Sequence, residues 1–176
     1  MGENPKSVFN IGAPAVENIL QIKAISRNEF ERKIKTKMRK TNFLFTYHPS
    51  LYSKQRVENL CKEILHSLDQ FPDAFILFTG SNMDAGSATI TKKIQEFCKK
   101  NSKRTKYIPS LGQSLYLNAL KHFQVVIGNS SSGIIEAPYF KIPTVNIGDR
   151  QKGRIRTASI IDVPESSTAI TKAIRK

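Results

Sequence analysis

The stretch from Asn42 to Thr79, NFLFTYHPSLYSKQRVENLCKEILHSLDQFPDAFILFT, decides the fold. It begins and ends with short, nearly continuous apolar runs, 42–47 and 74–79, which are typical of strands buried on both faces of a sheet. Between them, residues 53–70 carry apolar side chains at helical spacing, which predicts an amphipathic helix. A strand, a helix and a second strand in this arrangement form a unit that joins two parallel strands.

The same alternation continues to the end of the chain. The remaining predicted strands lie at 105–108, 124–128, 143–147 and 159–163, and the remaining predicted helices at 89–100, 114–123, 132–140 and 166–175. Crossovers between parallel strands are right-handed, so the helices cover both faces of the sheet. The predicted fold class is α/β, with a doubly wound, Rossmann-like parallel sheet at residues 41–176.

The first forty residues fit this alternation less well. A strand is predicted at 8–11 and a short helix at 15–22. Ser26 and Glu29 have the spacing of a capping box, which predicts a helix that begins there and runs to Met38. We interpret residues 1–40 as a connecting segment that contains helices.

The composition excludes several classes of protein. The 176 residues suffice for one domain of ordinary size, and the 39% of hydrophobic residues exclude a disordered chain. No apolar run approaches about 18 residues, which argues against a membrane span, and residues 1–6 lack the layout of a secretory signal. Cys61 and Cys98 have no metal-binding spacing and indicate no disulfide framework. We therefore expect a reduced, cytoplasmic protein that uses no metal and no membrane.

The chain is strongly basic. It carries 28 lysine and arginine residues against 14 aspartate and glutamate residues, a formal net charge of +14. The basic residues gather at 32–40, 99–106, 150–156 and 172–176. Lysine outnumbers arginine about two to one, which favours solvated helix faces over bidentate phosphate contacts. A site for a small anion is the second interpretation, an acidic partner domain would also balance the charge, and nucleic acid is the least favoured partner.

Polar, small and basic residues follow the predicted strands. In an open parallel sheet, ligands bind outside the carboxyl ends of the strands, at the crevice where the strand order reverses. The segments at these ends are YHP at 47–49, TGSN at 79–82, IPS at 108–110, GNSSSG at 128–133 and GDRQKGR at 148–154. Together they predict a binding site at this edge of the sheet.

The segment from Gly128 to Gly133 carries the most chemistry. Three hydroxyl groups between glycines, at a predicted helix N-terminus, favour phosphate binding. The alternative is that Ser132 only caps the helix. The guanidinium groups at Arg150 and Arg154, on the next predicted strand end, favour the phosphate interpretation. The segment is neither a Walker loop nor a dinucleotide turn.

Three further side chains have both a functional and a structural interpretation. Glu136 lies about one turn into the predicted helix, where it would bind ribose hydroxyls or remain solvated. His48 follows a strand and precedes Pro49, so it would face the crevice or be structural. Tyr116 lies on an apolar helix face, where core packing competes with stacking on a base.

Two longer segments, GNSSSGIIEAP at 128–138 and IPTVNIGDRQKGR at 142–154, resemble the UDP-N-acetylglucosamine 2-epimerases, specifically the hydrolysing branch that feeds sialic and legionaminic acid synthesis. YHP at 47–49, NMDAG at 82–86 and VFNIGAP at 8–14 fit the same family in the same order. The resemblance implies a two-domain GT-B fold with UDP in the cleft. This chain would be the C-terminal, UDP-binding half.

The resemblance also implies roles for individual residues. Ser130 and Ser131 would bind the phosphates, Arg150 would approach them, and Glu136 would bind the ribose. His48 would face the reacting sugar. The other implied UDP contacts are Asn82 at the nucleotide, Ile108 and Tyr116 on either side of the uracil, and Arg154 in the basic loop.

The family reaction, as the resemblance implies it, eliminates UDP to give a glycal and then adds water, which yields the 2-epimeric free sugar without a cofactor. Its acid and base carboxylates belong to the N-terminal half, so this chain alone is expected to bind UDP weakly and to turn over little. Self-association through an exposed domain interface is a further expectation. Two alternatives stay open: the nucleotide-sugar donor domain of a GT-B glycosyltransferase, and a non-catalytic UDP-sugar binder.

Overall fold

The structure is a computed structural model that describes residues 4–9, 11–12, 14–49 and 54–176. Six parallel strands form one sheet in the order β3-β2-β1-β4-β5-β6. The strands are β1 (Thr41–Thr46), β2 (Ala74–Thr79), β3 (Thr105–Ile108), β4 (Val125–Gly128), β5 (Thr144–Ile147) and β6 (Ile160–Val163). This is the doubly wound, Rossmann-like order that the sequence predicts.

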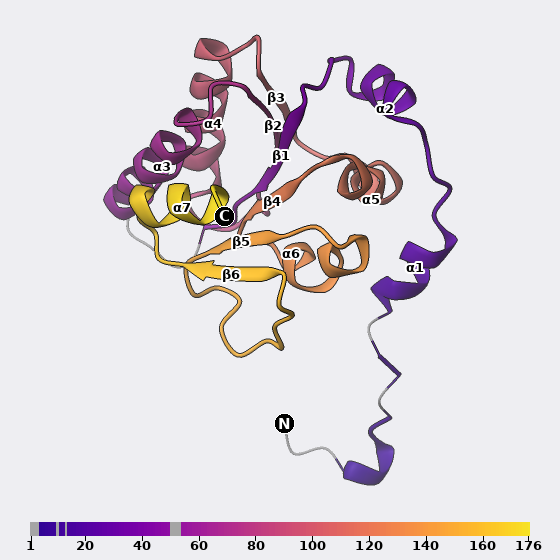
Figure 1. Ribbon diagram of the computed structural model, residues 1–176. Helices are drawn as coiled ribbons and strands as arrows, with labels where there is room; N and C mark the ends of the chain where they lie inside the picture. Colours follow the sequence, from indigo (N-terminus) through magenta and orange to yellow (C-terminus); the bar gives the residue numbers. More distant parts are fainter. Residues whose placement is uncertain (1–3, 10, 13, 50–53) are drawn as a thin grey trace.

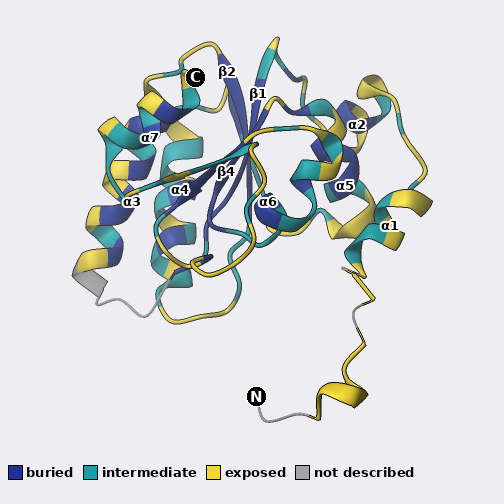
Figure 2. Cartoon of the chain, turned by 60° about the horizontal axis from the view of Figure 1, so that its bottom comes forward, coloured by how far each residue is buried: buried dark blue, intermediate teal, exposed yellow. Residues whose placement is uncertain are grey.

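Helices cover both faces of the sheet (Figures 1 and 2). One face carries α3 (Lys54–Asp69), α4 (Ser87–Lys100) and α7 (Ser167–Ile174). The other carries α2 (Arg27–Ile34), α5 (Gly112–His122), α6 (Ser132–Ile135) and the 3₁₀ helix η2 (Ala137–Phe140). In the part of the chain that is described, no helix is long and apolar enough to cross a bilayer.

The core consists of two apolar layers, one on each face. Along β1, Phe43 and Phe45 belong to the layer under α3, α4 and α7, whereas Leu44 belongs to the layer under α2 and α5. Successive side chains of a strand point to opposite faces, so a strand covered on both sides must be apolar at every position. This is why the strands appear in the sequence as continuous apolar runs.

The predicted helix at 132–140 is wrong in its length. It divides into α6, only four residues long, and η2, with Glu136 between them. Pro138 has no amide hydrogen and cannot continue an α-helical ladder, which explains the break. The short α6 contributes much less helix dipole than the predicted helix would.

The predicted helix from Ser26 to Met38 is also too long. The Ser26 hydroxyl caps α2 by accepting from the Glu29 N–H, as the capping box predicts, but α2 ends at Ile34. Lys35 then adopts a left-handed conformation with φ of 51°. That conformation ends the helix and redirects the chain toward β1.

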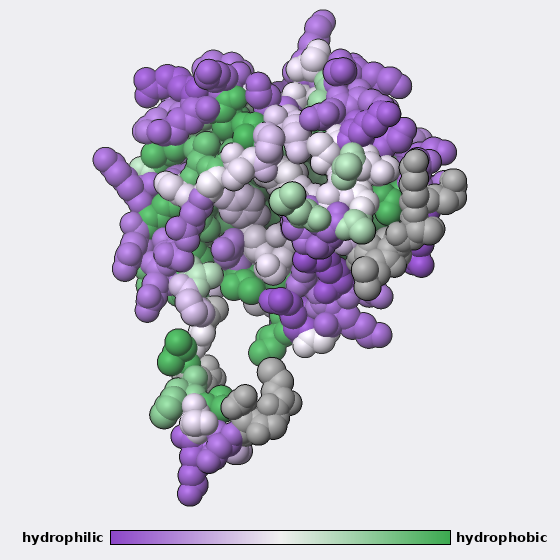
Figure 3. Space-filling view, turned by 180° about the vertical axis from the view of Figure 1, so that it is seen from behind, coloured by the Kyte–Doolittle hydropathy of each residue, from purple (hydrophilic) through white to green (hydrophobic). Residues whose placement is uncertain are grey.

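The N-terminal part that carries the 3₁₀ turn η1 (Pro5–Ser7) projects from the domain as an arm (Figures 1 and 3), whereas α1 (Ala15–Gln21) lies beside α5, with Ile19 packed against the apolar layer. The predicted strand at 8–11 is wrong: Val8, Phe9 and Ile11 are in no strand, and Asn10 lies outside the described residues. Because no strand of the sheet lies beside the arm, these residues have no hydrogen-bonding partner strand, and the Phe9 side chain is 79% exposed.

The strand order reverses between β1 and β4, which are direct neighbours in the sheet. Thr46 pairs with Gly128 at the carboxyl end of these strands, and Gly128 has a φ of +133°. A β-carbon at Gly128 would overlap the carbonyl oxygen of Thr46. Only glycine therefore allows the two strands to meet at the switch point.

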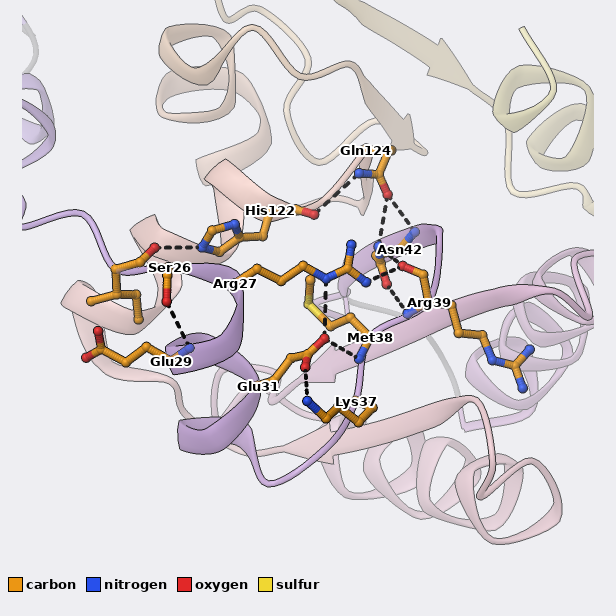
Figure 4. A network of polar contacts seen from close by, with 11 residues as sticks. Ser26, Arg27, Glu29, Glu31, Lys37, Met38, Arg39, Asn42, His122 and Gln124 are labelled. Carbon is orange, nitrogen blue, oxygen red and sulfur yellow. Dashed lines mark hydrogen bonds and ion pairs between the residues drawn. The ribbon is translucent and has the colours of Figure 1, made fainter.

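The opposite, amino edge of the sheet is closed by a polar network (Figure 4). The Glu31 carboxylate, 6% exposed, accepts from Lys37 Nζ at 2.8 Å, the Met38 N–H at 3.0 Å and Arg27 Nε at 3.3 Å. The Lys37 contact and the other donors outweigh burial and lower the pKa of Glu31 from its ordinary value of 4.5 to about 2. The carboxylate thus holds the connection from α2 to β1 in place.

Replacing Gly128 tests the close approach at the switch point. Gly128→Ala should lower the free energy of unfolding by about 3 kcal/mol or more, because it adds a backbone overlap to an unfavourable φ. Gly153→Ala is the control, since Gly153 also has a positive φ, +85°, but faces open space. It should cost about 1 kcal/mol. Urea unfolding measures both, and equal costs would contradict the steric argument.

The low pKa of Glu31 predicts how stability depends on acid. The unfolded state binds the proton near pH 4.5 and the folded state only near pH 2, so this contribution is present above pH 4.5 and is lost as the pH falls toward 2. Glu31→Gln should lower the stability at pH 7 and flatten its decline between pH 5 and about 2.5. Urea midpoints across this range measure it, and a slope as steep as that of the wild type would refute the assignment.

Candidate functional site

A cavity of about 430 Å³ opens at the carboxyl edge of the sheet. The loops after β2 and β3, the first turns of α5 and the β4–α6 loop form its wall. Of the predicted site residues, Tyr116, Ser130 and Glu136 line it. Its volume lies in the range of roughly 300–1,000 Å³ that is usual for small-molecule sites.

Two hydroxyl groups in this cavity wall have no hydrogen-bond partner among the described residues, Tyr116 Oη and Ser132 Oγ, and both atoms are buried. Burial raises the pKa of Tyr116 to about 12, while the nearby hydroxyls of Ser132 and Thr46 act in the opposite direction. Ser132 is the first residue of α6 and its Oγ accepts from none of the helix amides, so the alternative that Ser132 serves only as a cap is not supported. An unpaired buried hydroxyl costs about 1–3 kcal/mol, and such groups in a cavity indicate a site for a polar ligand.

His48 follows β1 and is held on three sides. Its N–H donates to Asn129 Oδ1 at 2.7 Å, and its carbonyl accepts from Asn129 Nδ2 at 2.8 Å. Its ring atom Nδ1 accepts from the N–H of Asn82 at 3.0 Å, so the proton of the neutral ring is on Nε2. Burial, with the positive charge of Arg150, lowers the pKa of His48 below its ordinary value of 6.5. The ring is therefore a neutral donor at pH 7.

The basic loop after β5 attaches to the same place. The carbonyl oxygen of Asn129 accepts from Gln151 Nε2 at 2.8 Å and from Arg150 Nη1 at 3.2 Å. The Arg150 guanidinium therefore lies against the residue that precedes Ser130. The strand ends of β2, β1, β4 and β5 are linked in this way, at the edge where the sequence predicts a site.

Sequence reasoning missed Asn129 and Gln151 as site residues and left Ser132 open between phosphate binding and helix capping. Asn129 lies inside the GNSSSG segment, next to the serines that attract attention as phosphate ligands. Gln151 lies between the basic residues of its loop and yet is 2% exposed. No pattern in the sequence indicates that burial, because it depends on contact with a loop 22 residues earlier.

Six of the nine predicted residues do not line the cavity. His48, Asn82 and Arg150 gather instead at the strand ends described above, and the other three lie elsewhere. Ser131 precedes α6, and its carbonyl accepts from the amides of that helix. Ile108 ends β3 and packs against the apolar layer under α5. Arg154 lies at a second, more apolar hollow of about 740 Å³, together with Tyr139 and the 91% exposed Ile155. Across the described ranges, no group of three or more histidine, cysteine, aspartate or glutamate residues could hold a metal ion.

The chain is similar to known proteins over its whole length. A family model described as UDP-N-acetylglucosamine 2-epimerase matches residues 1–176. The chain belongs to this family. It is 41% identical over 162 residues to the GDP/UDP-N,N'-diacetylbacillosamine 2-epimerase (hydrolyzing) of Campylobacter jejuni, covering 92% of this chain and 42% of that protein. It is 42% identical over 175 residues to the polysialic acid biosynthesis protein P7 of Escherichia coli, covering 99% of this chain and 44% of that protein.

Solved structures share the fold. A Staphylococcus aureus MnaA–UDP co-structure superposes with a TM-score of 0.66 at 18% identity, over 99% of this chain and 45% of that one. The C-terminal domain of a group 1 glycosyl transferase, LpcC from Francisella tularensis, superposes with a TM-score of 0.55 at 14% identity. The superposition covers 90% of this chain and 85% of that one. The chain thus has the fold of the C-terminal domain of GT-B proteins, and it spans less than half the length of the curated relatives that it matches.

The lack of a hydrogen bond at the Tyr116 hydroxyl predicts that removing this group does not destabilise the ligand-free protein. Tyr116→Phe should leave the stability of the ligand-free protein unchanged or raise it by up to about 1 kcal/mol, since the variant loses no hydrogen bond and removes a buried polar group. Tyr47→Phe is the matched control: the Tyr47 hydroxyl donates to Glu165 Oε1 at 3.1 Å, so the variant should lose about 1 kcal/mol. Thermal unfolding measures both; a larger loss for Tyr116→Phe would show that its hydroxyl is paired.

Proposed function

We propose that the chain is the UDP-sugar-binding half of a hydrolysing UDP-N-acetylglucosamine 2-epimerase, with 41–176 as the UDP-binding domain and 1–40 as the connection to another domain. One observation carries the proposal: the cavity at the carboxyl edge combines unpaired buried hydroxyls with a guanidinium on the adjoining loop. A nucleoside diphosphate needs both, since its base and sugar require an enclosed pocket and its phosphates require cationic donors.

The nucleoside occupies the enclosed part of the site. Glu136 lines the cavity and accepts the ribose hydroxyls, as carboxylates do in dinucleotide folds. Tyr116, from α5, borders the uracil. Ile108 ends β3 outside the cavity lining but directly before Pro109, which lines it, and would approach the uracil from that side. The Tyr116 hydroxyl, unpaired in the cavity wall, supplies a donor and an acceptor for a polar group of the ligand.

The diphosphate lies toward the switch point. Ser130 and Ser131 donate hydrogen bonds there, and Arg150, fixed against the Asn129 carbonyl, supplies positive charge. Arg154 adds charge to the same loop from the side of the second hollow. Asn82 acts at the nucleotide edge, where its N–H also orients the His48 ring.

The reaction has two steps, the elimination of UDP and the addition of water. A proton leaves C2 of the sugar, the C1–O bond breaks with its electron pair going to UDP, and a glycal forms. Water then adds across the double bond to give the free, 2-epimeric sugar. Negative charge grows on the leaving phosphate, where Arg150 and the Nε2–H of His48 stabilise it.

The acid and base groups come from the other domain. Among the described residues that line the cavity, Glu136 is the single carboxylate, and it is assigned to the ribose. Proton transfer at C2 needs a positioned group with a matched pKa. The isolated chain therefore binds UDP and does not turn over, and the partner domain completes the site in the cytoplasm. The sugar is a 2-acetamido sugar, either N-acetylglucosamine or a diacetylated 6-deoxy relative.

Calorimetry with UDP tests the proposal. The chain should bind UDP more tightly than ADP, and Arg150→Ala should weaken binding by about 10- to 100-fold, the loss expected for one charge-assisted hydrogen bond. Arg32→Ala is the control, because Arg32 is an exposed arginine of α2 and should leave the affinity unchanged. The proposal is refuted if the wild type does not bind UDP or binds ADP equally well. If the chain alone hydrolyses UDP-N-acetylglucosamine at a typical enzymatic rate, a second domain is not needed.

A further inference from the structure

We propose that Asn129 is a positioning residue that holds His48 and Arg150 in one rigid frame across the switch point. The inference deepens the proposed function, on which its consequence for UDP rests, whereas the geometry of the frame stands by itself. Asn129 is 1% exposed and follows β4 directly.

The side chain of Asn129 extends the sheet beyond its last backbone pair. The register of β1 and β4 ends at Thr46 and Gly128, and the Asn129 N–H still donates to the Thr46 carbonyl at 3.2 Å. Beyond this point the side-chain amide continues the pairing: it accepts from the His48 N–H and donates to the His48 carbonyl, at 2.7 and 2.8 Å. A primary amide matches both groups of one residue because it offers a donor and an acceptor side by side.

The main chain of Asn129 holds the other half of the frame. Its carbonyl receives Gln151 Nε2 at 2.8 Å and Arg150 Nη1 at 3.2 Å. Gln151 is buried, and its backbone carbonyl accepts from Arg156 Nη2 at 2.7 Å. Arg156 Nε also donates to Asp162 Oδ2 of β6 at 3.0 Å. The basic loop is therefore attached to Asn129 through Gln151 and to β6 through Arg156, and the hydrogen bond to the Asn129 carbonyl holds the Arg150 guanidinium at the switch point.

The frame determines the surroundings of the His48 ring. Asn82 from the loop after β2 donates to Nδ1, and the charged groups nearest the ring are Arg150 from the loop after β5 and Asp84 from the loop after β2. Burial and Arg150 lower the pKa of His48, while Asp84 opposes them. If the Asn129 amide is lost, the His48 backbone is free to move, the ring gains solvent, and its pKa should return toward 6.5.

The chain offers a matched control for a buried asparagine. Asn118 in α5 is fully buried, and its side chain accepts from the Ile25 N–H at 3.0 Å and donates to the carbonyls of Lys23 and Ser114. These hydrogen bonds tie the segment before α2 to α5 and involve neither His48 nor the basic loop. Asn118→Ala therefore removes comparable hydrogen bonds without touching the frame.

The experiment is an NMR titration of the histidine rings in the full chain, which contains three histidines. His48→Gln identifies the His48 signal. In the wild type, this ring should titrate below pH 6.5. Asn129→Ala should raise its pKa toward 6.5, and Asn118→Ala should leave it at the wild-type value. The Asn129→Ser hydroxyl can pair with only one of the two His48 backbone groups, so this variant should give a smaller rise of the His48 pKa. If Asn129→Ala does not fold, the Asn129→Ser variant is compared with the wild type instead.

UDP calorimetry on the same variants provides the second measurement. Asn129→Ala keeps the main-chain carbonyl that holds Arg150 and Gln151, so its effect on UDP acts through His48. It should weaken UDP binding by about tenfold, and Asn118→Ala by less than about twofold. An unchanged His48 pKa in both Asn129 variants overturns the positioning role. If the wild type does not bind UDP, the proposed function fails, and the histidine titration still decides whether the frame exists.

Discussion

The close approach of β1 and β4 is the constraint on which the rest of the structure depends. Gly128 lets the two strands pair to their last residues because a side chain there would enter the Thr46 carbonyl. The next residue, Asn129, can then reach His48 with its side chain. A cavity wall, a neutral imidazole and a guanidinium therefore converge at a single point of the sheet, the point where the strand order reverses.

The two edges of the sheet use polar groups in opposite ways. At the amino edge, the Glu31 network is fully paired, with donors for its buried carboxylate, and it connects α2 to β1. At the carboxyl edge, hydroxyl groups of Tyr116 and Ser132 remain buried and unpaired. A paired network stabilises the fold. An unpaired buried hydroxyl lowers the stability of the ligand-free protein, and a ligand that forms a hydrogen bond with it removes this penalty. This difference distinguishes the amino edge from the carboxyl edge, where we propose the binding site.

Most of the sheet could be predicted from local pattern. The apolar runs of β1 and β2 and the helix between them are visible because burial on both faces makes every strand position apolar. The errors have local physical causes. Pro138 divides the predicted helix at 132–140, Lys35 ends α2 early, and the residues at 8–11 find no neighbouring strand.

The sequence by itself determined the fold class, the edge that carries the polar residues and the family, because periodicity and short motifs are properties of neighbouring residues. Only the tertiary structure decided which of those residues meet. It joined Asn129 to His48 and to the basic loop, buried Gln151, and placed Arg154 at a different hollow from Glu136. Such contacts connect residues 22 or 81 positions apart, and only the packing of strands brings them within hydrogen-bond distance.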